Sequence, residues 1–191
     1  MLQINRDTIT KVPVLDVMGG VSAYADEQIA LAHYYGNGGK NSCENTELAV
    51  SMLLDDQPIN GYLALNMDAV GIVTDLVGGV TLTITSDFSE IDPSLVQGDT
   101  MTLDGQKALT YVRSRHHIDD QTNIARMRRQ QQFLTALEEK LKQQDTEFAA
   151  KAYDALSDYM VTDIASGTAA KIGEKLKQYK RLDTLTLSLI H

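Results

Sequence analysis

The chain has little cysteine, no long apolar run and few positive charges. Cys43 is the only cysteine among 191 residues, which excludes an intramolecular disulfide and a structural zinc site built on cysteines. We expect Cys43 to be a small residue near the start of a helix. No run of about 18 apolar residues and no signal-peptide pattern is present, so the sequence predicts neither a membrane anchor nor a signal peptide.

Acidic residues outnumber basic ones, at 26 against 17, and the formal net charge is −9. Such a chain repels polyanions on average, so we expect no nucleic-acid partner. The hydrophobic content of 43% and charged content of 23% are typical of a globular protein. Without repeats or low-complexity linkers, the sequence predicts a single domain over residues 1–191.

Strand and helix patterns alternate along the chain. Strands are expected over residues 2–10, 61–66, 80–85 and 184–190, and helices over 22–39, 42–56, 68–79, 104–112, 123–144, 146–160 and 167–181. Residues 86–103 are expected to form a long loop. This alternation predicts an α/β fold, with a sheet flanked by helices on both faces.

Five of the seven arginines fall between Arg113 and Arg129. We expect an extended segment after residue 112, which would place Arg113 and Arg115 on the same side. The neighbouring His116 and His117 diverge in any extended segment and are expected to be turn residues rather than metal ligands.

The next helix is expected to begin with a cap from Thr122 or Asn123. Arg126 and Gln130 then share one face, beside Arg129. A helix N-terminus attracts anions, and guanidinium groups bind phosphate oxygens in pairs. The segment therefore predicts a phosphate or pyrophosphate site. The alternative is a solvated basic face on a helix whose apolar side carries Ile124, Met127, Leu134 and Leu141, with ion partners among Asp119, Asp120, Glu138 and Glu139.

Two segments, "LDGQKALTYVRSR" and "NIARMRRQQQFL", resemble the signature of the LytR-CpsA-Psr family. Four others follow in the family's order: "INRDT", "QIALAHYYGNGG", "YLALNMDAVGIVTDLVGGVTLTI" and "YMVTDIA". The resemblance covers residues 2–190. It implies a central mixed sheet between helices, on the extracellular face of the cytoplasmic membrane of mostly Gram-positive bacteria. The implied activity is a phosphotransferase reaction that moves a cell-wall glycopolymer, such as teichoic acid or capsular polysaccharide, from a polyprenyl-pyrophosphate carrier to peptidoglycan.

The resemblance also assigns roles to residues. Its strand-end arginine corresponds to Arg6 and its paired arginines to Arg113 and Arg115, which we expect to act in catalysis. Pyrophosphate binding is expected from the set Arg6, Arg113, Arg115, Arg126, Arg129 and Gln130. Asn5 stands where the family has proline, which is expected to loosen a turn, and Asn123 stands near a usual aspartate.

The family's domain begins further upstream than this chain, with strands that carry two magnesium-binding aspartates. We therefore expect a chain that lacks the first strands and the Mg²⁺ ligands, transfers poorly and self-associates through exposed sheet edges. The alternative function is a non-catalytic polyprenyl-pyrophosphate-binding or regulatory module, following the family's older label of transcriptional attenuator.

Overall fold

The computed structural model describes residues 2–118, 121–145, 147–176, 178, 182 and 185–187. Contacts between Cα atoms divide the chain into two compact units, each with its own apolar core. Unit 1 comprises residues 1–64, 160–168 and 180–191, and unit 2 comprises residues 65–159 and 169–179. The single domain over residues 1–191 stays a prediction.

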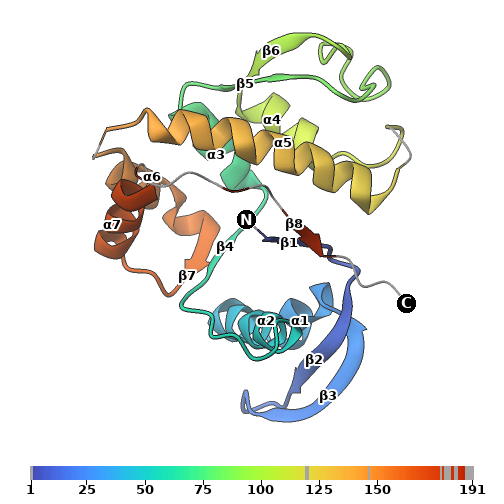
Figure 1. Ribbon diagram of the computed structural model, residues 1–191, viewed down its shortest axis with the longest axis vertical. Helices are drawn as coiled ribbons and strands as arrows, with labels where there is room; N and C mark the ends of the chain where they lie inside the picture. The colour runs from blue at the N-terminus through green and yellow to red at the C-terminus, as the bar shows by residue number, and fades with distance from the viewer. Residues whose placement is uncertain are drawn as a thin grey trace. The chain divides into compact units, whose positions relative to one another are not determined.

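Unit 1 combines short strand pairs with two helices (Figure 1). Its elements are β1 (Leu2–Ile4), β2 (Ile9–Leu15), β3 (Val21–Gln28), α1 (Ala30–Tyr35), α2 (Gly39–Leu53), β4 (Leu63–Leu65, which ends in unit 2), β7 (Met160–Thr162) and β8 (Leu185–Leu187). β1 pairs in parallel with β8, β2 pairs antiparallel with β3, and β4 pairs with β7.

Unit 2 is mainly helical (Figure 1). Its elements are α3 (Asp68–Leu76), the antiparallel pair β5 (Val80–Thr83) and β6 (Thr100–Leu103), α4 (Gly105–Arg113), α5 (Asn123–Lys142), α6 (Phe148–Leu156), the 3-10 helix η1 (Ser157–Tyr159) and the end of α7 (Ser166–Leu176). The α/β class is confirmed. Within the described residues, the expected sheet takes the form of four two-stranded ladders.

The helix expected over residues 22–39 is wrong in its first part, where β3 forms a hairpin with β2. The turn depends on Asp16, whose Oδ1 accepts hydrogen bonds from Met18 N at 2.8 Å and Gly20 N at 3.0 Å. Gly19 supplies the left-handed conformation that the turn requires, with φ +85°. This turn chemistry outweighs the helical pattern, and α1 begins only after the hairpin.

The long loop expected over residues 86–103 is wrong at its end, where β6 pairs with β5. Two hydroxyl pairs join the exposed faces of these strands: Thr81 with Thr102 at 2.8 Å and Thr83 with Thr100 at 2.7 Å. Threonine favours strands through such cross-strand contacts. Four residues are too short a run to be recognised as a strand from sequence alternation alone.

The start of α2 has no side-chain cap hydrogen bond. The N-cap is Gly38, with φ +95°, and its N–H donates to Ser42 Oγ at 2.8 Å. Asn45 instead lies buried and donates from Nδ2 to the carbonyls of Pro13 and Ala32, at 2.9 and 2.7 Å. Cys43 lies near the helix start as expected, and burial raises the pKa of its thiol, so it stays protonated.

The buried face of α5 only partly matches the expected apolar side. Of the four expected residues, only Met127 is buried, and Ile124, Leu134 and Leu141 are 36–48% exposed. Phe133 and Leu137 are buried in their place. Phe133 and Leu137 join the core of unit 2. The rotation of α5 is set by polar residues, because its side chains hydrogen-bond the end of α4, as described below.

Helices α3 and α4 approach closely through two glycines. A Cβ on Gly105 would lie 2.5 Å from the Gly71 carbonyl oxygen and 2.6 Å from Asp75 Oδ2. The Gly105 N–H also donates to Asp75 Oδ1 at 2.7 Å. Glycine is therefore required at this contact by space rather than by backbone conformation.

Gly105→Ala is expected to lower the free energy of unfolding by about 1–3 kcal/mol, because backbone must shift to admit the methyl group. Urea denaturation followed by circular dichroism measures the change. Gly173→Ala is the control, since nothing lies within 4 Å of its Cβ and alanine in a helix interior adds about 1 kcal/mol. Equal stability of the two variants would contradict the close approach.

Candidate functional site

The arginine segment lies in unit 2, at the junction of α4 and α5. Asp104 caps α4 by accepting from Lys107 N at 2.9 Å. The helix includes Arg113, so the extended segment starts one residue later than expected, at Ser114 (φ −60°, ψ 139°). Ser114 N still donates to Thr110 O at 3.1 Å, which completes the last turn. Arg113 is exposed and Arg115 is half-buried.

The segment between the helices is a turn, and its two histidines are turn residues, as predicted. His117 has φ +59°, and its Nδ1 lies 3.2 Å from Glu90 Oε2, with both side chains about 70% exposed. Asp119 and Asp120, expected as ion partners, lie outside the described residues. At the start of α5, Thr122 Oγ1 accepts from Ala125 N at 3.1 Å, so Thr122 is the cap.

Arg129 is buried, with only 2% of its surface exposed. Its Nε donates to Tyr111 O at 3.2 Å, its Nη1 to Ser86 Oγ at 3.4 Å, and its Nη2 to Ser114 O. The guanidinium also lies 5.8 Å from the centre of the Phe88 ring. These groups enclose the side chain, so Arg129 orients the end of α4. Direct contact between Arg129 and a ligand stays a prediction.

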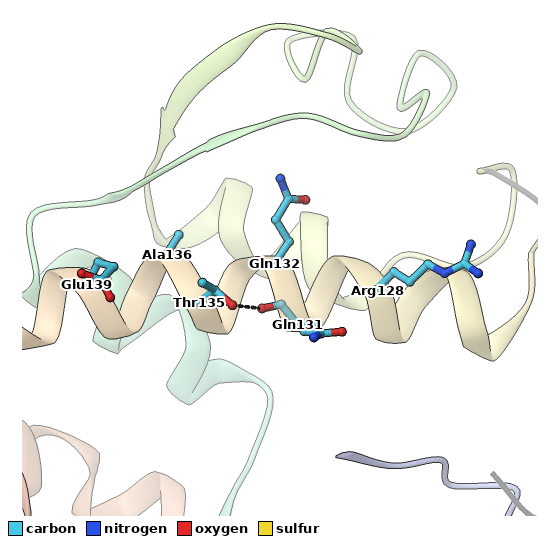
Figure 2. Close-up of a pocket in the computed structure, with 6 residues that line it drawn as sticks. All are labelled: Arg128, Gln131, Gln132, Thr135, Ala136 and Glu139. Carbon is cyan, nitrogen blue, oxygen red and sulfur yellow. Dashed lines mark hydrogen bonds between the residues drawn. The ribbon is translucent and has the colours of Figure 1, made fainter. Parts of the chain in front are cut away.

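Two glutamine side chains continue this contact along α5. Gln130 Nε2 donates to Val112 O at 3.2 Å, so α5 bonds three carbonyls at the end of α4. Gln132, which points toward β5 in Figure 2, donates from Nε2 to Thr83 O at 2.8 Å, and its Oε1 accepts from Tyr111 Oη at 2.6 Å. Side-chain donors to the carbonyls at a helix end stabilise such a junction.

Three arginines keep no carboxylate partner in the described part of the chain: Arg113, Arg115 and Arg128. Glu138 and Glu139, the described candidates for ion pairing, both pair with Lys142, at 3.0 and 2.9 Å. Those bonds raise the pKa of Lys142. Arg126 is half-buried, and its Nη2 donates to Asn123 Oδ1 at 2.8 Å.

The loop that supplies Ser86 and Phe88 has its own support. Asp87 Oδ1 accepts from Ser89 N at 2.9 Å. This backbone hydrogen bond, together with one from the Ser89 side chain, lowers the pKa of Asp87. This turn lies between Ser86 and Ser89, in the loop whose Ser86 and Phe88 contact Arg129.

Arg6 belongs to unit 1, where it lies in the turn between β1 and β2. Its Nε is 3.6 Å from Asp7 Oδ1, and 55% of its side chain is exposed. Asn5 Oδ1 accepts from Asp7 N at 3.0 Å, and the expectation that Asn5 loosens this turn stays a prediction. An asparagine that bonds the backbone two residues on closes a turn without proline.

No three histidine, cysteine, aspartate or glutamate side chains come together in the described ranges to hold a metal ion. In the same ranges, no helix has both the length and the apolar content to cross a membrane.

The model of the LytR_cpsA_psr family matches residues 1–189. The chain belongs to this family. It is 31% identical over 137 residues to the polyisoprenyl-teichoic acid–peptidoglycan teichoic acid transferase TagU of Bacillus subtilis, covering 72% of this chain and 40% of TagU. TagV of the same organism is 28% identical over 98% of this chain and 47% of its own length. The chain spans about half the length of the curated relatives it matches.

Solved structures of the family share the fold. A protein described as a transcriptional regulator from Enterococcus faecalis superimposes with a TM-score of 0.77 at 25% identity, covering 98% of this chain and 64% of that protein. The crystal structure of B. subtilis TagV gives a TM-score of 0.72 at 25% identity, over 98% and 70% of the two chains.

Arg129→Met is expected to lower the free energy of unfolding by about 3 kcal/mol, because buried carbonyls lose charged donors. Arg128→Met removes the same charge from an exposed neighbour and should change stability by no more than about 0.5 kcal/mol. Urea denaturation of both variants separates the positioning role of Arg129 from a general need for positive charge. Similar losses in both would contradict that role.

Proposed function

We propose that this chain binds the pyrophosphate of a polyprenyl-linked glycopolymer and belongs to a protein that transfers a teichoic acid or capsular polysaccharide to peptidoglycan. Family membership and the transferase names of the relatives support this proposal. The observation that carries it is the arginine geometry at the α4–α5 junction. Arg113 and Arg115 project from a fixed helix end and have no carboxylate partner in the described residues.

Arg113 and Arg115 are proposed to bind the pyrophosphate oxygens directly, with Arg126 and Gln130 beside them on α5. When the glycopolymer is transferred, negative charge builds on the leaving pyrophosphate, and fixed guanidinium groups lower the barrier by stabilising that charge. Arg129 acts through its bonds to α4. Arg6 enters the proposal through the match of its segment to the family pattern alone.

We also propose a cellular location, a metal cofactor and self-association. A protein that handles lipid-linked wall polymers would act on the extracellular face of the cytoplasmic membrane. Magnesium is proposed on family membership alone. Self-association is proposed through the β2–β3 hairpin, where Val17 and Met18 are 97% and 89% exposed.

Arg113→Ala/Arg115→Ala is expected to weaken binding of farnesyl pyrophosphate about a hundredfold, because two charged hydrogen-bond donors are lost. Calorimetric titration with and without magnesium measures the effect. Lys151→Ala/Lys171→Ala removes the same charge from exposed sites on α6 and α7 and should retain wild-type affinity. Unchanged affinity of the arginine variant, or no binding by the wild type, would contradict the proposal.

A further inference from the structure

Asparagine precedes glycine at two places in the sequence, Asn37–Gly38 and Asn60–Gly61. Asparagine is among the thermolabile residues, because the backbone nitrogen of the next residue can attack its side-chain carbonyl carbon. Glycine permits this attack best, since it has no Cβ to shield its nitrogen and its backbone angles are the least restricted. Whether either pair reacts therefore depends on how firmly the fold holds the two reacting groups.

The fold holds both reacting groups of the first pair by hydrogen bonds. The Gly38 N–H donates to Ser42 Oγ at 2.8 Å, and Asn37 Nδ2 donates to Asp16 O at 3.1 Å. Both bonds must break before the Gly38 nitrogen can reach the Asn37 side chain. Asn37 is exposed to solvent, so its protection comes from these two bonds and not from exclusion of water.

The second pair lacks such bonds, although Asn60 is exposed as well. Among the residues that the structure describes, neither the Asn60 side chain nor the Gly61 N–H has a hydrogen-bond partner. The pair lies in the irregular segment between α2 and β4 (Figure 1). The nearest bonded groups are Gln57 O, which accepts from Ser51 Oγ at 2.7 Å, and Tyr62. The backbone between them is free to bring the nitrogen close to the side chain, as the reaction requires.

We propose that Asn60 is a site of spontaneous covalent modification, at which the chain converts asparagine to aspartate and isoaspartate with water as the co-reactant. The Gly61 nitrogen gives its proton to a solvent base and bonds to the Asn60 side-chain carbonyl carbon. The bond from that carbon to the amide nitrogen then breaks, and the nitrogen leaves as ammonia after taking a proton from water. Water opens the resulting cyclic imide at either of its two carbonyl carbons, and the two openings give the two products. No electrons are transferred, one water is consumed and one ammonia is released.

The modified residue would meet a tightly packed and acidic neighbour. A Cβ placed on Gly61 lies 3.1 Å from Asp163 Oδ1 and 3.3 Å from Ile164 Cγ1, so the backbone has little room on that side. Isoaspartate adds one carbon to the main chain directly before Gly61. Either product also adds a carboxylate one residue away from this contact, and like charges repel at short range.

The residue after Gly61 joins the start of β4 to the end of β7. Tyr62 N donates to Asp163 Oδ1 at 2.9 Å, and Thr162 Oγ1 donates to Tyr62 O at 2.6 Å. We expect modification of Asn60 to strain these two bonds and so to weaken the pairing of β4 with β7. All of these residues belong to unit 1, so the inference does not depend on the proposed pyrophosphate site in unit 2.

The wild-type chain is incubated at mildly alkaline pH, and its peptides are then mapped by mass spectrometry with an isoaspartate-specific methyltransferase assay. Asn60 is expected to react at least about tenfold faster than Asn37, because breaking two hydrogen bonds slows a reaction by roughly that factor or more. In urea, where the fold is lost, both sites should react at similar rates. Equal rates at both sites of the folded chain, or reaction at neither, would overturn the proposal.

Three variants assign the cause. Ser42→Ala removes the acceptor of the Gly38 N–H and should raise the rate at Asn37 severalfold, with the rate at Asn60 unchanged. Ser94→Ala, an equal change at an exposed site in unit 2, should leave both rates unchanged. Asn60→Gln should abolish the second modification, since glutamine would have to close a larger ring. An unchanged rate at Asn37 in folded Ser42→Ala would contradict protection by the hydrogen bond.

The structural effect is measured by amide hydrogen exchange. The Tyr62 amide proton should exchange faster in the incubated wild type than in fresh protein, because its bond to Asp163 is strained. Asn60→Gln carried through the same incubation should show no such change. Equal Tyr62 exchange in modified and fresh protein would contradict the expected effect on β4.

Discussion

The arrangement of unit 2 depends on the buried guanidinium of Arg129. It joins two parts of the chain: the end of α4, through the carbonyls of Tyr111 and Ser114, and the loop after β5, through Ser86 and the ring of Phe88. Burying a charge is unfavourable unless its donors are satisfied. Here carbonyls at the end of α4 are among the acceptors. The same bonds therefore satisfy the buried guanidinium of Arg129 and hold the end of the helix.

This junction determines what the other arginines can do. Because α5 holds the carbonyls of Tyr111, Val112 and Ser114, α4 ends at a defined residue and in a defined direction. Arg113 then lies on the last turn of a fixed helix, and Arg115 lies two residues beyond it. Precise placement of ligand-binding side chains depends on this kind of support. The segment is thus divided between residues that build the junction and residues that face outward from it.

Local signals predicted the starts of α4 and α5 well, because Asp104 and Thr122 cap their own helices. The phosphate site that guanidinium spacing predicts in this segment stays a prediction. The sequence could not predict that Arg129 is buried while Arg128 is exposed. Adjacent arginines cannot be told apart until the rotation of α5 is known. That rotation follows from contacts with Ser86 and Tyr111, 43 and 18 residues away in the chain. The β3 strand was missed for a related reason, because the Asp16 turn decides its pairing partner.

In an acidic chain, nearby carboxylates could be expected to pair with the arginine cluster. Within the described residues, no carboxylate pairs with Arg113, Arg115 or Arg128. Glu138 and Glu139 lie about three turns after Arg128 on the same helix. Lys142 lies four residues beyond Glu138 and three beyond Glu139, and it bonds both. Such exposed pairs add little stability. Their effect is to hold carboxylates at the far end of α5 while Arg128 and the end of α4 stay positive. Helical spacing, rather than net charge, therefore decides where an anion can bind.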